Sequence, residues 1–301
     1  LLAMDHALSR GCRPACQTRL LRLYGLLLIP TAAFSKYAHA MKLVMKQSAL
    51  RRVWLLVGWL ALWGQPTLAG VDIRVAVAAN FTATLEALAG PYEQASGNRL
   101  VISPGATGAL YSQIANAAPF DVFLAADELR PRKLVEHGMA VAGTAFVYAQ
   151  GIPVLWSPDA ALIDAEASVL RQGQFRYLAL AEPRTAPYGA AARSVLEALD
   201  LWDALERRRQ LVRGSSVAQT HSQVASGAIE LGFVALAQVQ TAQGIPGSHW
   251  IPPAELYAPL TQGAVLLSSA RARAAARHFL RWLQDDAEAA AIIEAAGYRR
   301  G

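Results

Sequence analysis

The sequence predicts an α/β fold of two lobes, each a mainly parallel sheet flanked by helices, joined by a hinge of two chain crossings. Three observations predict this fold. Residues 71–138 alternate short apolar runs with helical patterns, and residues 152–243 repeat the alternation with different loops. A late strand pattern and two helical patterns in 263–296 have no sheet of their own. We therefore expect this late segment to return to the first sheet.

Residues 71–82, VDIRVAVAANFT, are expected to form a strand that ends in a turn of small residues and opens the first helix. The near-continuous apolar run from Ile73 to Ala78 is typical of a strand covered on both faces. Asn80 then stands at an expected helix N-cap, with Thr82 in the first turn. A strand that leads directly into a helix directs unpaired backbone N–H groups at the end of the sheet. This arrangement favours an anion site.

The remaining elements follow the same alternation, because apolar residues recur first at strand spacing and then at helical spacing. In the first lobe we expect strands at 99–103 and 120–126 and helices at 109–117 and 128–137. In the second we expect strands at 152–156, 175–180, 211–213 and 231–236 and helices at 189–199, 217–226 and 237–243. The late segment is expected to form a strand at 263–267 and helices at 270–283 and 286–296.

The two crossings are expected near 147–150 and 251–258. They divide the chain into lobe I (71–147 plus 256–301) and lobe II (148–255). Two lobes joined by two crossings can close about a hinge, and the cleft between them is the expected ligand site.

Residues 41–69 have the layout of a secretory signal peptide. Four basic residues follow Met41, an apolar run of about a dozen residues comes next, and Thr67-Leu68-Ala69 provides a small-x-small cleavage site. An uncleaved anchor is the alternative. Residues 1–40 are expected to be an upstream or non-native extension. A signal peptide without cysteine at its cleavage site predicts a soluble periplasmic protein.

The net charge of +6 does not indicate a nucleic-acid partner. Nine of the 28 Lys and Arg residues, but only one of the 22 acids, lie in residues 1–70, so the rest of the chain is slightly acidic. Both cysteines, Cys12 and Cys16, also lie there, which leaves no thiolate metal site afterwards. No G-x-S-x-G, P-loop or H-E-x-x-H motif is present, so we expect no enzyme and no cofactor. A hydrolase or a ligand-sensing domain on the same fold are the remote alternatives.

Four stretches resemble the periplasmic molybdate-binding proteins of ABC transporters, in the subgroup whose first helix begins with AANF. They are VAVAANFTATLEAL (75–88), SPGATGALYSQIANAAPFDVFLAAD (103–127), EPRTAPYGAAARSVLEALDLWD (182–203) and SSVAQTHSQVASGAIELGFV (215–234). The similarity extends to the final AAGYR, and the stretches keep the family's order and spacing. The resemblance implies the type II periplasmic-binding-protein fold and delivery of the ligand to a membrane permease by a monomer.

The resemblance also implies the ligand contacts. In that family, hydroxyl or amide side chains and backbone N–H groups hold the anion through its oxygens, without metal–protein bonds. Carried over by position, these contacts come from Asn80, Thr107, Tyr188 and Val217, the last two through backbone N–H groups. Thr82 and Ser216 are expected as supporting donors. A tyrosine hydroxyl that many relatives place near the strand at 231–236 is replaced by Ala235.

The choice of ligand rests partly on chemistry. A fully deprotonated tetrahedral dianion needs only donors, whereas a protonated phosphate also needs an acceptor, normally a carboxylate. None of the four donor segments has Asp or Glu at its tip. Molybdate, tungstate and sulfate are therefore favoured over phosphate. The choice of molybdate, with tungstate, over sulfate or another tetrahedral oxyanion rests on the resemblance alone.

Overall fold

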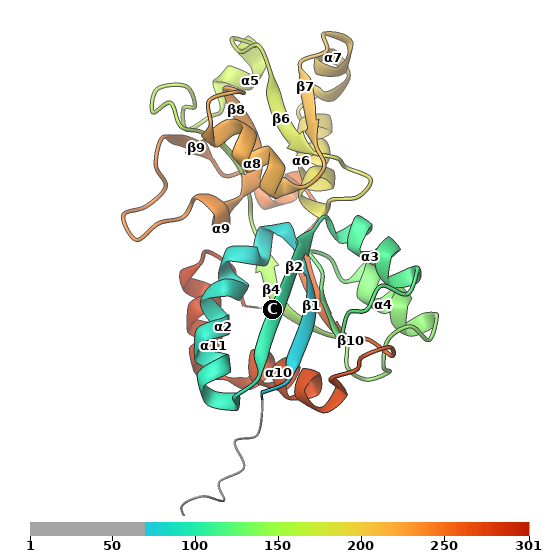
Figure 1. Ribbon diagram of the computed structural model, residues 1–301. Coiled ribbons are helices and arrows are strands. Elements are labelled where there is room, and N and C mark those ends of the chain that lie inside the picture. The colour runs from blue at the N-terminus through green and yellow to red at the C-terminus, as the bar shows by residue number, and fades with distance from the viewer. Residues whose placement is uncertain (1–69, 301) are drawn as a thin grey trace, which may run out of the picture. The chain divides into compact units, whose positions relative to one another are not determined.

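The computed structural model describes residues 70–300, which form two α/β lobes (Figure 1). The expected extension (1–40) and signal peptide (41–69) lie outside the described residues. None of the helices in residues 70–300 combines the length and the apolar character that a bilayer crossing requires. The two-lobed α/β architecture predicted from the sequence is confirmed.

Lobe I is built on a five-stranded sheet in the order β2-β1-β3-β10-β4. β2, β1 and β3 are parallel, and only β10 runs against its neighbours. The strands are β1 (Asp72–Ala78), β2 (Arg99–Gly105), β3 (Val122–Leu124), β4 (Phe146–Gly151) and β10 (Leu260–Leu266).

Helices cover both faces of this sheet (Figure 1). α2, α10 and α11 pack on one face against the side chains of Ile73, Val75 and Val77. α3 and α4 pack on the other against Ala76 and Phe123. The helices are α2 (Thr82–Ser96), α3 (Thr107–Ala115), α4 (Leu129–Glu136), α10 (Arg273–Asp285) and α11 (Ala287–Ala295), and a short 3-10 helix, η1 (Ala79–Phe81), precedes α2.

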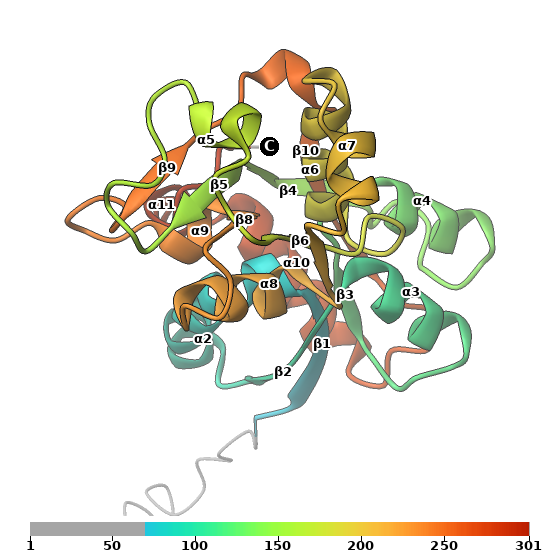
Figure 2. The ribbon, with the colours of Figure 1, turned by 90° about the horizontal axis from the view of Figure 1, so that it is seen from above.

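Lobe II repeats this plan with the order β7-β6-β8-β5-β9, in which β5 is the reversed strand. α6 and α7 pack on one face of the sheet and α8 and α9 on the other (Figure 2). The strands are β5 (Pro153–Ser157), β6 (Leu178–Ala181), β7 (Leu211–Gly214), β8 (Leu231–Ala235) and β9 (Ser248–Trp250). The helices are α5 (Ser168–Gln172), α6 (Pro187–Ala198), α7 (Trp202–Arg207), α8 (Val217–Ala225) and α9 (Leu236–Val239). A 3-10 turn, η2 (Ala254–Leu256), precedes β10.

The chain passes between the sheets at Ile152, between the end of β4 and the start of β5. It returns in the segment between β9 and β10. Residues 147–150, expected as a crossing, instead belong to β4, whose register with β10 joins Gly151 to Leu260. A lobe boundary after residue 147 would therefore divide a strand. In each sheet, the antiparallel strand is the first strand that the chain forms after it crosses from the other lobe: β5 in lobe II and β10 in lobe I.

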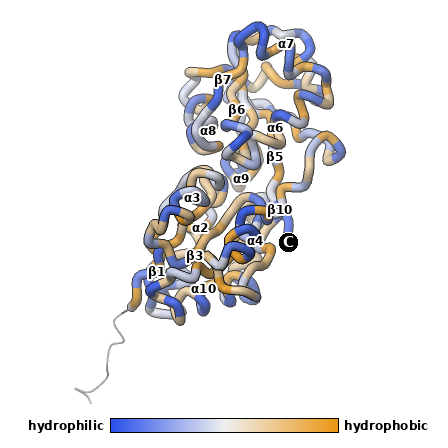
Figure 3. Tube along the Cα trace, turned by 90° about the vertical axis from the view of Figure 1, so that its right-hand side faces the viewer, coloured by the Kyte–Doolittle hydropathy of each residue, from blue (hydrophilic) through white to orange (hydrophobic). Residues whose placement is uncertain are grey.

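The two lobes share a layer of small apolar residues. Ala78, Ala79 and Ala126 of lobe I form one buried cluster with residues of α6 and α8 of lobe II. Outward-facing segments, such as the chain around α7, are mostly hydrophilic (Figure 3). Because alanine side chains are short, backbone atoms of the two lobes approach closely at this layer.

Asp121 joins distant segments of lobe I. Its carboxylate is buried, with 2% of the residue exposed, and accepts hydrogen bonds from the backbone N–H groups of Arg74 (2.8 Å), Arg271 (2.7 Å) and Ala272 (3.1 Å). The carboxylate thus links β1 to the segment before α10. These hydrogen bonds support a structural role for Asp121.

We expect Asp121→Ala to lower the free energy of unfolding by about 2–4 kcal/mol, because it leaves three backbone N–H groups without their acceptor. Urea denaturation measures this change. Asp285→Ala, an exposed position at the end of α10, is the matched control and should change stability by less than about 0.5 kcal/mol. Equal stability of the two variants would contradict the structural role.

Candidate functional site

The four residues expected to contact a ligand lie around one small cavity between the lobes. The cavity has a volume of about 10 Å³, so the surrounding atoms are already close together. No acidic or basic side chain is among the residues that line it. The lining residues are Ala78, Ala79, Asn80, Gly105, Ala106, Thr107, Ala126, Ala186, Pro187, Tyr188 and Val217.

Asn80 reaches the cavity from η1, not from a helix N-cap. The N-cap prediction is wrong, because Ala79–Phe81 forms a 3-10 turn and Phe81 stands at the N-cap of α2. The amide nitrogen of Asn80 donates to Gln262 Oε1 (2.9 Å) and to the hydroxyl of Tyr298 (3.1 Å). The first N–H groups of the turn have no acceptor within it. The side chain thus holds the turn that presents these N–H groups.

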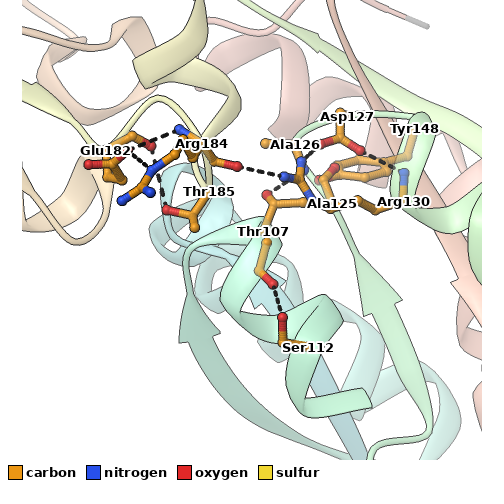
Figure 4. Close-up of polar contacts among 11 residues, drawn as sticks. Thr107, Ser112, Ala125, Ala126, Asp127, Arg130, Tyr148, Glu182, Arg184 and Thr185 are labelled. Atoms are coloured by element: carbon orange, nitrogen blue, oxygen red, sulfur yellow. Dashed lines mark hydrogen bonds and ion pairs between the residues drawn. The ribbon is translucent and has the colours of Figure 1, made fainter. Parts of the chain in front are cut away.

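Thr107 is the first residue of α3 and is 1% exposed. Its hydroxyl oxygen accepts a hydrogen bond from the backbone N–H of Ala126, at 3.1 Å (Figure 4). A hydroxyl that accepts one bond still has its own hydrogen to donate. Thr107 therefore offers the cavity a side-chain donor and an unpaired backbone N–H at a helix start.

Tyr188 is the second residue of α6, after Pro187, which has no N–H. Its backbone N–H is therefore the first available donor at this helix start. The phenol is buried, and its hydroxyl accepts a weak hydrogen bond from Gln262 Nε2, at 3.5 Å. Burial raises the pKa of Tyr188 well above its usual value, so the hydroxyl stays protonated.

Val217 is the first residue of α8, and its apolar side chain is buried in the small-residue layer. Only its backbone N–H can act as a polar donor. Ser216 is the N-cap of this helix and accepts a hydrogen bond from the backbone N–H of Gln219, at 3.3 Å. Thr82 donates to the carbonyl of Ala79, at 3.2 Å. Neither Ser216 nor Thr82 lines the cavity, but each supports a segment that does.

A buried polar network behind the cavity was not identified from the sequence. Gln262 of β10 is fully buried and accepts hydrogen bonds from Asn80 and from the hydroxyl of Tyr148, both at 2.9 Å. Tyr298 donates to the backbone carbonyl of Asn80, at 2.7 Å. Tyr298 lies within the AAGYR stretch, but nothing local in the sequence links these side chains to Asn80, because the contacts join residues about 180 to 220 positions apart.

The same network explains why residue 151 is a glycine. A Cβ atom built there would lie 2.1 Å from the hydroxyl of Tyr188 and 2.7 Å from Gln262 Nε2. Tyr188 of lobe II therefore packs directly against the crossing between the sheets. Ala235, the position at which the resemblance implies a tyrosine in many relatives, is buried among apolar residues and offers no side-chain donor.

Other candidate groups are accounted for by packing. His221 stacks on Trp156, with ring centroids 5.4 Å apart, and burial lowers its pKa. Trp156 donates its indole N–H to the carbonyl of Pro246, at 2.7 Å. Among residues 70–300, no group of three or more His, Cys, Asp and Glu side chains is arranged to hold a metal ion.

Known proteins share this fold. Residues 73–299 match the family model "Bacterial extracellular solute-binding protein". The molybdate-binding protein ModA of Azotobacter vinelandii is 45% identical over 228 residues, which are 75% of this chain and 89% of that protein. The ModA of Rhodobacter capsulatus is 42% identical over 233 residues, covering 77% and 90% of the two chains. These names describe binding proteins and no enzyme.

A solved structure agrees with the sequence relatives. The periplasmic molybdate-binding protein of Azotobacter vinelandii superposes with a TM-score of 0.75 at 46% sequence identity, covering 76% of this chain and 99% of that one. The family-model match, over residues 73–299, spans both lobes. The chain therefore belongs to the bacterial extracellular solute-binding proteins and, within them, to the family of the molybdate-binding protein ModA.

Proposed function

We propose that the protein captures molybdate, and also tungstate, in the cavity between its lobes and delivers it to the permease of an ABC transporter. The observation on which the proposal mainly rests is the set of uncharged donors around the cavity. Its relatives in Azotobacter vinelandii and Rhodobacter capsulatus are named as molybdate-binding proteins, which supports this choice of ligand. The ligand is bound cargo, and no cofactor is involved.

The donor set suits a dianion for an electrostatic reason. η1, α3, α6 and α8 all begin at the cavity, two from each lobe. The unpaired N–H groups and the dipole at a helix start stabilise an anion by about 0.3–1 kcal/mol, and by more where the site is partly buried. Four such starts replace the hydration of a doubly charged anion without any cationic side chain.

The same donors discriminate against protonated anions. The cavity lining includes no carboxylate, which is the usual acceptor for the hydrogen bond that hydrogen phosphate donates. We assign the anion contacts to the backbone N–H groups of Asn80, Tyr188 and Val217 and to the hydroxyl and N–H of Thr107. Thr82 and Ser216 support these segments.

The cellular setting belongs to the same proposal. Residues 41–69 act as a cleaved signal peptide, and the protein works as a monomer in the periplasm. Its partner is the membrane permease. N-terminal sequencing of the secreted protein is the check, and a start before Gly70 would contradict the cleavage.

We expect molybdate and tungstate to bind with similar affinity, sulfate to bind more weakly and phosphate not to bind. Tungstate has the charge and shape of molybdate, sulfate is smaller, and hydrogen phosphate carries a proton for which the cavity lining offers no carboxylate acceptor. Calorimetric titration of the purified protein with the four anions measures this order. Sulfate binding as tight as that of molybdate would contradict selection by size, and binding of none of the four would contradict the proposed function.

We expect Asn80→Ala to weaken molybdate binding by about 1–3 kcal/mol, because the turn loses its hydrogen bonds to Gln262 and Tyr298. Asn80→Asp should weaken binding by about 100-fold or more, since it places a carboxylate beside a dianion at nearly constant shape. Asn116→Asp, exposed at the end of α3, is the charge-matched control. Unchanged affinity in both Asn80 variants would remove Asn80 from the site.

We expect Thr107→Val to weaken molybdate binding by about tenfold or more, whereas Thr107→Ser retains most of the affinity. Valine keeps the shape of threonine but has no hydroxyl to donate, and it leaves the N–H of Ala126 unpaired. Calorimetric titration compares the two variants. Equal affinities would show that the hydroxyl does not contact the anion.

A further inference from the structure

Two hydrogen bonds join the lobes directly beside the cavity. The backbone N–H of Gly108 in α3 donates to the carbonyl of Thr185 at 2.8 Å. The guanidinium of Arg130 in α4 donates to the carbonyl of Arg184 at 3.2 Å. Gly108 follows the cavity residue Thr107, and Thr185 precedes the cavity residue Ala186. The two bonds therefore lie at the rim of the proposed anion site, and neither uses a group assigned to the anion.

The acceptor side of this inter-lobe contact is a turn held by its own hydrogen bonds. The N–H groups of Thr185 and Ala186 both donate to the carbonyl of Glu182, at 3.2 and 3.0 Å. The side chain of Glu182 accepts a hydrogen bond from Arg184 Nε at 2.9 Å. The turn thus presents two consecutive carbonyl oxygens to lobe I in a fixed arrangement.

The donor side is fixed as well. Arg130 forms an ion pair with Asp127, whose carboxylate also accepts the backbone N–H of Arg130 at 2.9 Å. Both side chains are about one-fifth exposed. With one side of the guanidinium held by Asp127, Nη2 remains directed at Arg184 (Figure 4). A fixed donor loses little conformational entropy when it forms a hydrogen bond, so this one can contribute measurably to the closed arrangement.

The close approach of the lobes also requires glycine at residue 108. A Cβ atom built on Gly108 would lie 3.0 Å from both Cα and O of Thr185 and 3.1 Å from Arg130 Nη2. Two of these atoms belong to the backbone of the other lobe. A methyl group at this position therefore separates the lobes without altering any group assigned to the anion.

We infer that Arg130 is a positioning residue that holds the lobes together over the anion cavity, and that it thereby raises the affinity for every oxyanion by the same factor. The inference rests on the proposed function, because it extends the role of the same cavity. The physical reason is linkage: a contact made only in the closed arrangement raises its population, and the observed affinity rises in proportion to that population.

The main test compares Arg130→Met with Arg132→Met. Arg132 lies on the same helix and pairs with Glu128, and no hydrogen bond or ion pair joins it to lobe II within residues 70–300, so the control removes an equal charge. We expect Arg130→Met to raise the dissociation constants of molybdate and tungstate by the same factor, about tenfold, mainly through faster dissociation. Arg132→Met should bind molybdate and tungstate with the same affinity as the unaltered protein. Unaltered affinity in Arg130→Met, or a changed ratio between the two anions, would overturn the inference.

Two further variants separate the hydrogen bond from the charge. Arg130→Lys keeps the charge but not the planar group that contacts Asp127 and Arg184 together, so its affinity should fall nearly as far as that of the methionine variant. Affinity retained in Arg130→Lys would assign the effect to charge and overturn the inference. Gly108→Ala should also weaken the binding of molybdate and of tungstate by equal factors. Its thermal stability should be unchanged or raised, because alanine favours the helix. Unchanged affinity in Gly108→Ala would likewise count against the inter-lobe contact.

A measurement without ligand makes the inference independent of the proposed function. Spin labels at Glu136→Cys in α4 and Asp203→Cys in α7, with Cys12 and Cys16 replaced by serine, report the distance between the lobes by double electron–electron resonance. In the absence of any anion, Arg130→Met should shift the distances to longer values relative to Arg132→Met. Identical distributions would overturn the inference, whichever anion the protein binds.

Discussion

The structure depends on one topological constraint: four strands lead into helices that all begin at the cavity between the lobes. The carboxyl ends of β1 and β2 in lobe I and of β6 and β7 in lobe II lead into η1, α3, α6 and α8. In a parallel sheet the carboxyl ends of neighbouring strands share one edge, and ligands bind there where the connections diverge. Since the two lobes have the same strand order, their edges can face each other across one cavity.

This constraint explains the composition of the cavity wall. Backbone N–H groups must approach closely, so the surrounding side chains are mainly Ala and Gly. The larger polar groups are placed behind the wall, where Gln262, Tyr148 and Tyr298 are buried and hydrogen-bonded. A fully satisfied buried network is rigid, whereas an unsatisfied one is costly. The network therefore keeps the η1 turn in place without adding charge near the anion.

Local patterns in the sequence were sufficient to predict much of the fold and most of the residues around the cavity. The apolar run before Asn80 and the helical spacing after it locate β1 and α2, because both depend on neighbouring residues. Thr107, Tyr188 and Val217 could be named from a resemblance whose motifs are continuous stretches. All three line the cavity with Asn80.

Long-range contacts account for what the sequence did not reveal. β4 was missed because its strand character comes from pairing with β10, more than a hundred residues later. The sequence predicts Asn80 at a helix N-cap, but hydrogen bonds to Gln262 and Tyr298 hold it in a 3-10 turn. The inter-lobe contact of Arg130 ends on a backbone carbonyl, an acceptor that every residue possesses and no motif can mark.

The strand order also determines which lobe can fold first while the chain is being synthesised. Lobe II is one uninterrupted segment between the two crossings, so all of its strands emerge in succession. Lobe I cannot complete its sheet until β10 has been made, because β10 lies between β3 and β4. Lobe II can thus finish folding before lobe I, although lobe I begins first in the chain. Until β10 is made, β3 and β4 have exposed edges. A nascent chain halted before residue 260 would present an intact lobe II beside an open sheet.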